Sequence, residues 1–185
     1  MTVSEIFEKL NSHLVEGVML HDQLSEYYDF LNLQGYKRCH EYHAFCEFKT
    51  RRKVMGYYLN HYNRLPLAEK ATNPKAIPEN WCNYTRQEVD AGTKKRAVRD
   101  SFSKWVDWEM ATKKLYEEAV CNLYKIGEIA TACEIKKLVK DVDHELKTAQ
   151  RKAIALASID YDMPTIYCEH QEMHDKYKNK MKRSR

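Results

Sequence analysis

The chain has 185 residues, of which 43% are hydrophobic and 31% are charged, and its formal net charge is +4. This composition is typical of one folded globular domain and excludes a chain that is disordered throughout, and the mild charge permits an acidic partner without requiring one. Only five glycines and four prolines interrupt the chain, which favours long helices over many short strands.

The first predicted helix spans residues 3–34, where apolar residues recur at intervals of three and four. Thr2 or Ser4 is expected to cap its start, and Gly35 is expected to end or kink it. A second helix is predicted from about 36 to 64. The short link between the two helices favours an antiparallel hairpin.

Residues 65–84 hold three of the four prolines, which predicts a long connection that crosses the bundle. Thr85 followed by Glu88 predicts a capping box at the start of a third helix, which runs to about Gly127. A fourth helix is predicted over residues 132–159.

The C-terminal segment 165–185 predicts a short fifth helix that ends in a basic tail, and no part of the sequence alternates as a strand does. The sequence therefore predicts an all-α protein: a four-helix bundle over residues 1–164 with a long crossover connection, followed by a short C-terminal helix.

The N-terminal sequence MTVSEIFEKLNSHLVEG has no basic segment followed by an apolar run, and no stretch approaches the ~18 apolar residues of a membrane span. The six cysteines include no C-x-x-C pair, so their spacing fits neither a zinc finger nor a thioredoxin motif. We therefore expect a cytoplasmic protein with reduced thiols and no membrane partner.

Two long helices, a long crossing connection, two more long helices and a short terminal one form an order that resembles the ferritin-like superfamily. The likeness covers nearly the whole chain and rests on layout. In that family two helices each offer a Glu and two each offer a Glu-x-x-His, all pointing inward at a di-iron site. The resemblance implies a centre for iron or manganese with a redox or storage role.

The first and third helices offer single carboxylates for such a centre. Glu26 is the expected ligand on the first helix, where His21 lies on the more apolar stripe. Glu109 is the expected ligand on the third helix, and Tyr116 follows it seven residues later, as in the family's helix pattern.

The second and fourth helices lack an intact Glu-x-x-His. The stretch GYKRCHEYHAFCEFKTRR offers His40, His43 and Glu47 instead, at spacings that share one side of a helix. On the fourth helix only Glu145 leans toward the apolar face. The ligand set that the resemblance implies is Glu26, His40, His43, Glu47, Glu109 and Glu145.

The same histidines have a second interpretation, as a helix flank that bonds to tyrosine and arginine neighbours. Arg51 and Arg52 lie one turn beyond Glu47 and could neutralise it in place of a metal ion. Because both paired motifs are broken, the sequence slightly favours a bundle that has lost its metal and needs no cofactor.

His170 and His174 are a further pair spaced by four residues. Gln171 stands where a zincin motif has its glutamate, so we expect a surface helix there. No Ser-His-Asp elbow, Walker loop or dinucleotide fingerprint appears, and no catalytic residue is predicted.

Three basic clusters and thirteen tyrosines favour a surface that binds a protein and/or nucleic acid, and such a surface also allows a homodimer. The predicted partner-binding residues are Arg51, Arg52, Lys94, Lys95, Arg96, Arg99, Lys176, Lys178, Lys180, Lys182 and Arg183. The chain is also similar in general character to small accessory proteins of phages and mobile elements of Gram-positive bacteria, although no motif carries this likeness. The favoured function is a non-catalytic interaction protein, for example an inhibitor of a host defence nuclease; the alternative is a di-metal carboxylate protein.

Overall fold

The computed structural model describes residues 1–65, 70–77, 85 and 89–184, with residues 183 and 184 described by their backbone alone. The five helices are α1 (Val3–Phe30), α2 (Gln34–Tyr62), α3 (Ala91–Lys125), α4 (Ile129–Ser158) and α5 (Met163–Ser184). This part of the chain contains no strand, so the predicted all-α class is confirmed. No helix within it is long and apolar enough to cross a membrane.

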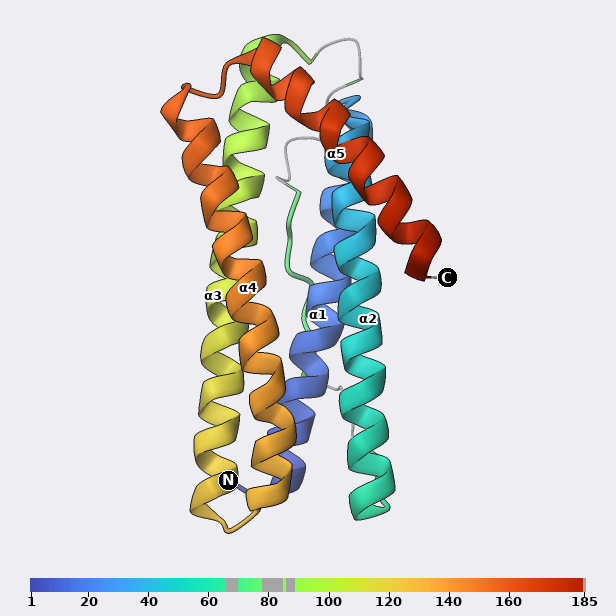
Figure 1. The fold of residues 1–185 in the computed structure, drawn as a ribbon, viewed down its shortest axis with the longest axis vertical. Coiled ribbons are helices and arrows are strands. Elements are labelled where there is room, and N and C mark those ends of the chain that lie inside the picture. Colours follow the sequence, from blue (N-terminus) through green and yellow to red (C-terminus); the bar gives the residue numbers. More distant parts are fainter. Residues whose placement is uncertain (66–69, 78–84, 86–88, 185) are drawn as a thin grey trace.

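The four long helices form two antiparallel hairpins, α1 with α2 and α3 with α4, and α5 crosses the upper part of α2 (Figure 1). The connection between α2 and α3 leads from the lower end of the bundle to its upper end. Residues 70–77 of this connection lie against α1, where Glu16 and Gln23 accept hydrogen bonds from backbone N–H groups of the segment, each at 2.7 Å. The predicted crossover is thus confirmed, while residues 66–69 and 78–84 of it lie outside the described part of the chain.

The start of α3 differs from the prediction. The helix begins at Ala91, and its N-cap is Asp90, whose carboxylate accepts a hydrogen bond from the backbone N–H of Thr93 at 2.6 Å. Val89 and Asp90, which would lie inside a helix capped at Thr85, are not helical, so the capping box predicted there is wrong. Its second member, Glu88, lies outside the described residues. An aspartate directly before a helix competes well with a threonine box, because both satisfy the same unpaired N–H groups.

The turn between α1 and α2 also differs from the prediction. α1 ends at Phe30, Asn32 adopts a left-handed φ of 58°, and Gly35 lies in the first turn of α2 instead of ending α1. A Cβ atom on Gly35 would lie 1.6 Å from the backbone oxygen of His170 in α5. The glycine therefore lets the backbone of α5 come into contact with α2.

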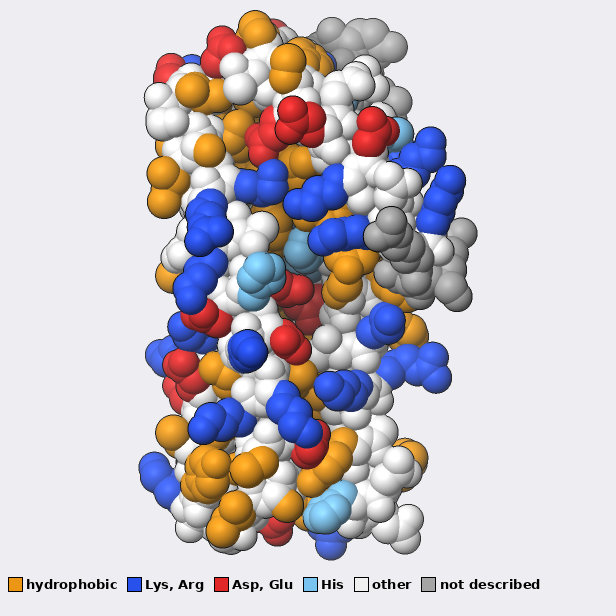
Figure 2. All heavy atoms as spheres, viewed as in Figure 1, with side chains coloured by type: hydrophobic (Ala, Val, Ile, Leu, Met, Phe, Trp, Pro, Cys, Tyr) orange, Lys and Arg blue, Asp and Glu red, His pale blue; other side chains and the backbone are white. Residues whose placement is uncertain are grey.

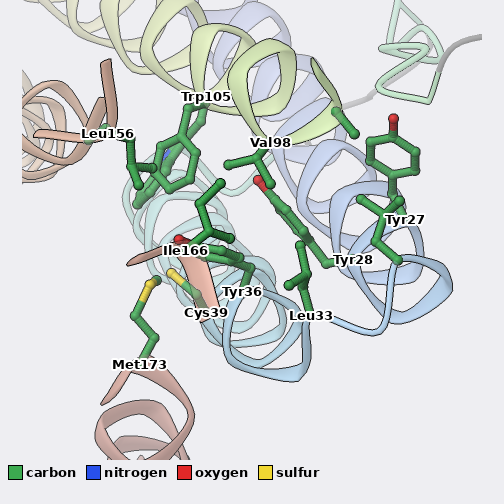
Figure 3. Packing of buried hydrophobic residues seen from close by; sticks show 14 of the residues in the cluster. Tyr27, Tyr28, Leu33, Tyr36, Cys39, Val98, Trp105, Leu156, Ile166 and Met173 are labelled. Carbon is green, nitrogen blue, oxygen red and sulfur yellow. The ribbon is translucent and has the colours of Figure 1, made fainter. Parts of the chain in front are cut away.

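Two large apolar clusters fill the bundle, and a small third one joins Leu20 and Leu24 of α1 to Ala76 of the connection. The upper one joins all five helices, and Figure 3 shows Tyr36, Cys39 and Trp105 packed with Ile166 and Met173 of α5. The lower one is built from the other halves of the four long helices. Between the clusters lies a layer of buried polar side chains, His21, His40, His43, Glu47, Glu109 and Thr112. Such a layer is costly unless its groups find partners, so it is where a functional site is expected.

Candidate metal centre

The middle of the polar layer is formed by His21 of α1, His43 of α2 and Glu109 of α3, whose exposed fractions are 0%, 7% and 0%. One ligating atom of each lies within 4.8 Å of the other two. Each of the three also has a buried atom without a hydrogen-bond partner: Nε2 of both histidines and Oε2 of Glu109. An unsatisfied buried polar atom costs about 1–3 kcal/mol, so three such atoms on residues whose ligating atoms lie this close together fit a cation that all three residues coordinate.

His40, one turn before His43, orients His21. The Nδ1 atoms of His40 and His21 lie 2.9 Å apart, so one of them donates a hydrogen bond to the other. The His40 ring stacks on Tyr28 at a centroid distance of 5.4 Å, and the hydroxyl of Tyr28 is bonded to that of Ser101. Because Nδ1 of His21 is engaged in this way, Nε2 is the atom that remains for a ligand.

Glu109 is oriented by Trp105, one turn earlier on α3. The indole Nε1 donates a hydrogen bond to Oε1 of Glu109 at 2.9 Å. The indole also packs against His43, with ring centroids 4.8 Å apart. One carboxylate oxygen is thus held in place, and the other remains for a ligand.

Burial keeps the histidines of this layer neutral. It holds the pKa of His21 well below the usual 6.5, and the neighbouring imidazoles of His40 and His43 lower it further. Burial, followed by the positive charges of Lys180 and Lys176, lowers the pKa of His43 to about 3. A neutral imidazole is the form that binds a metal ion, so these two ligands need not lose a proton first.

Burial has the opposite effect on the carboxyl groups. It raises the pKa of Glu109 to about 9, with smaller contributions from Glu145 and Glu47. It also raises the pKa of Glu47 to about 8 and that of Glu145 to about 7. A cation in this layer therefore displaces protons when it binds.

A cavity of about 50 Å³ opens between α2 and α4 beside this centre, and Glu47, Asp141 and Glu145 line it. The exposure of these three side chains decreases inward: Asp141 is exposed, Glu145 is half-buried and Glu47 is 8% exposed. Figure 2 shows acidic side chains and a histidine recessed in a hollow between these helices, among lysine and arginine side chains. The cavity exceeds the ~30 Å³ share of one water molecule, so a small cation fits on this side of the centre.

Two solved structures match almost the whole chain. A novel open pore ferritin from the hyperthermophilic archaeon Archaeoglobus fulgidus superposes with a TM-score of 0.76 at 15% identity, over 92% of this chain and 94% of that one. A closed form of the same ferritin, engineered by site-directed mutagenesis, gives a TM-score of 0.75 at 14% identity, over 94% and 96%. The chain has the ferritin-like fold. No protein-family model matches it, and no curated protein sequence matches it.

This ferritin-like bundle departs from the predicted ligand set at one residue. Glu26 is exposed on α1, whereas His21 is buried in the centre. The two residues are five positions apart, which separates them by about 140° around a helix, so both cannot face the core. The prediction that Glu26 points into the core of the bundle is therefore wrong. The signal for His21 was its place on the apolar stripe of the first helix.

The other predicted ligands lie in or beside the polar layer. His43 and Glu109 belong to the converging trio, His40 supports His21, and Glu47 and Glu145 line the cavity. On α2 the pattern is His40-x-x-His43, where the resemblance implied Glu-x-x-His. The bundle thus adds the imidazole of His21 to those of His40 and His43, which belong to the predicted set.

Several residues predicted to bind a partner are engaged within the protein. Arg51 donates from Nε to the side-chain oxygen of Asn11 at 2.7 Å, and Lys95 forms an ion pair with Asp160 at 2.5 Å. The ammonium groups of Lys94, Lys176 and Lys180 lie over tyrosine rings. Arg96 donates to the hydroxyl of Thr93 at 3.0 Å, Arg99 pairs with Asp100 at 3.1 Å, and the guanidinium of Arg52 lies over the ring of Phe48. Lys178 and Lys182 are exposed. The side chain of Arg183 lies outside the described residues, and partner binding by this set stays a prediction.

The buried carboxyls and histidines of the polar layer should make the stability of the metal-free protein depend on pH. The buried carboxyls have pKa values raised above 4.5, so they lower stability as the pH rises through 7 to 9. The buried histidines have pKa values below 6.5, so they lower stability as the pH falls below that value. Between pH 4.5 and 6.5 the two effects oppose each other.

We therefore expect the free energy of unfolding to fall from pH 6.5 to 9, by up to about 1.4 kcal/mol per pH unit for each carboxyl that is still protonated. Urea unfolding in the presence of a chelator, followed by circular dichroism, measures this slope. The variant E109Q removes one of the three carboxyls and should flatten it. A stability that rises from pH 6.5 to 9 would contradict the assignment of buried, neutral carboxyls.

Proposed function

We propose that this protein binds one divalent transition-metal ion in the middle of its ferritin-like bundle, through His21, His43 and Glu109. The observation that carries the proposal is that each of the three has a buried polar atom without a hydrogen-bond partner and that their ligating atoms lie within 4.8 Å of one another. The two similar structures, both ferritins, support a metal-binding role for this scaffold.

The interpretation of these histidines as an ordinary polar flank accounts less well for the contacts. Buried polar groups are usually hydrogen-bonded, so a polar helix flank without a metal ion should contain few buried atoms that lack a hydrogen-bond partner. Arg51, which was expected to neutralise Glu47, instead donates to Asn11. Glu47 has a pKa of about 8, which is typical of a buried carboxyl without a cationic neighbour.

The donor set indicates which ions fit. Two imidazoles and one carboxylate suit iron, zinc, cobalt and nickel, and the added imidazoles make the centre less favourable for calcium or magnesium. Among the described residues this trio is the one group of three or more such side chains close enough to share an ion, which favours one ion over the two of a di-iron site.

The chain's own residues define what surrounds the ion. Three protein ligands leave positions for water or a substrate, and a bound ion would supply Lewis-acid or redox chemistry there. His40 and Trp105 orient two of the ligands, and the carboxyls of Glu47 and Glu145 line the side from which solvent approaches. Among these groups, Glu109 is the one that releases a proton as it becomes a ligand.

The test is metal analysis of the purified protein after anaerobic incubation with Fe²⁺, Mn²⁺ or Zn²⁺ and desalting. We expect about one equivalent of at least one of these ions, bound more tightly as the pH rises from 6 to 8 because Glu109 must lose a proton. The variant E26Q, which alters the exposed glutamate of α1, should retain the metal. Less than about a tenth of an equivalent of every ion would refute the proposal.

A further inference from the structure

A second cavity, of about 390 Å³, lies where the turn between α1 and α2 meets α5. Its lining residues are Asn32 and Gln34 of the turn and Tyr167, His170, Gln171 and His174 of α5. These side chains are amides, imidazoles and a phenol, and none is a carboxylate. The volume falls within the range of small-molecule sites, and none of these residues belongs to the metal centre.

His170 determines which kind of ligand the cavity suits. It is 8% exposed, and its Nδ1 accepts a hydrogen bond from the backbone N–H of Gly35 at 3.3 Å. An N–H group only donates, so Nδ1 carries no proton, and Nε2 of the neutral ring must carry it. No described residue accepts a hydrogen bond from this Nε2–H. The side chain of His170 is thus largely buried and presents a hydrogen-bond donor to the cavity.

The same contact argues against a metal ion held by His170 and His174. Coordination through Nε2 of His170 would require a lone pair there, which moves the ring proton to Nδ1 and places it against the N–H of Gly35. Burial, followed by the neighbouring His174, also lowers the pKa of His170, which keeps its ring neutral. The spacing of His170 and His174 suggests a metal site in the sequence, but in the structure Nε2 of His170 carries a proton and cannot be a metal ligand.

The N-terminus of α2 and Lys94 place positive charge beside the cavity. The N-cap of α2 is Leu33, which has no side chain able to cap the helix, and the first turn holds no acidic residue. The N-terminus of a long helix carries a partial positive charge and unpaired N–H groups. Lys94 adds a full charge at the rim, where its Nζ lies 3.2 Å from the hydroxyl of Tyr167. Two carboxylates contact lining residues: Asp29 accepts a hydrogen bond from Nε2 of Gln34 at 2.6 Å and pairs with Lys37, and Asp175 lies 3.2 Å from Nδ1 of His174.

We propose that this cavity binds a small oxoanion of the phosphate class, either free phosphate or the phosphate group of a small molecule. The Nε2–H of His170 and the side-chain amides of Asn32, Gln34 and Gln171 supply donors, and Lys94 and the N-terminus of α2 supply positive charge. Phosphate presents acceptor oxygens only, which matches this set of donors. The proposal does not depend on the metal centre.

The experiment is calorimetric titration of the full chain with inorganic phosphate and, separately, with glycerol phosphate, in a phosphate-free buffer at low ionic strength. The variant Q171E places a carboxylate on the cavity wall and should weaken binding at least about tenfold, because like charges in contact cost several kcal/mol. The matched control N179E adds the same charge at an exposed position of α5 outside the cavity and should change the affinity less than about twofold. Tighter binding of one titrant identifies the source of the phosphate group.

A second readout is the Nε2–H resonance of His170 in ¹⁵N-labelled protein, which phosphate should shift in the wild type and in N179E. The proposal is overturned if neither compound binds at concentrations up to about 10 mM, or if both variants weaken binding equally, as general charge attraction would. It is also overturned if Ni²⁺ binds at this cavity and the substitution H174A abolishes that binding.

Discussion

Replacing Glu109 with glutamine should abolish metal binding and leave the bundle folded. Changing a residue that only supports a ligand costs 10–100-fold in metal affinity, so the loss of a direct carboxylate ligand should cost at least about 100-fold. Glu109 has a pKa of about 9 and is therefore protonated at neutral pH in the metal-free protein. Glutamine replaces that neutral carboxylic acid with an amide of the same shape, and Trp105 keeps an acceptor for its indole N–H.

Competition with a coloured chelator measures the affinity, and circular dichroism measures the unfolding temperature. The control is E117Q, which removes an exposed carboxylate from the same helix and should change neither quantity. If E109Q bound metal as tightly as the wild type, the ligand set would be wrong. If E109Q were unfolded, H21A and H43A would test the same centre through its other ligands.

Replacing Gly35 with alanine should detach or severely loosen α5. The added methyl group would lie 1.6 Å from the backbone oxygen of His170, and a backbone atom cannot rotate away as a side chain can. We expect a loss of about 3 kcal/mol in the free energy of unfolding, at the upper end of the range for overpacking. Hydrogen exchange should show faster exchange along α5, whose Met173 and Tyr177 belong to the upper core cluster.

Gly56 provides a matched control on the same helix. A Cβ there would meet no atom within 4 Å, and the residue lies in the interior of α2. The substitution G56A should therefore stabilise the protein by about 0.5–1 kcal/mol, because glycine is unfavourable inside a helix. Equal effects of G35A and G56A, or a protected α5 in G35A, would show that the contact between α2 and α5 is not needed.

The helices could be predicted from the sequence because their signals are local. Apolar residues at intervals of three and four mark the buried side of each helix, and the prolines mark the crossover. The error at the start of α3 lies in its cap, which the sequence predicts at Thr85 and the structure places at Asp90. Both can satisfy the first N–H groups of a helix, and only the packing of the whole chain selects one.

The candidate site could be predicted in part. The sequence points to His43 and Glu109 because each lies on the inward face of its own helix, and the structure places both in the converging trio. His21 was left on the apolar stripe and Glu26 was preferred, because a carboxylate matched the resemblance better. The bond between the Nδ1 atoms of His21 and His40 joins two helices, and no spacing within one helix reveals it.

The sequence by itself determined the all-α class, the order of the helices and most of their buried apolar residues, since these depend on side chains a few residues apart. Only the tertiary structure decided that His21, His43 and Glu109 meet. It also decided that α5 comes so close to Gly35 that the backbone N–H of Gly35 sets the tautomer of His170. These contacts join residues 22 to 135 positions apart, and they depend on how the helices are rotated and spaced against one another. That geometry follows from packing over the whole bundle, which no single helix encodes.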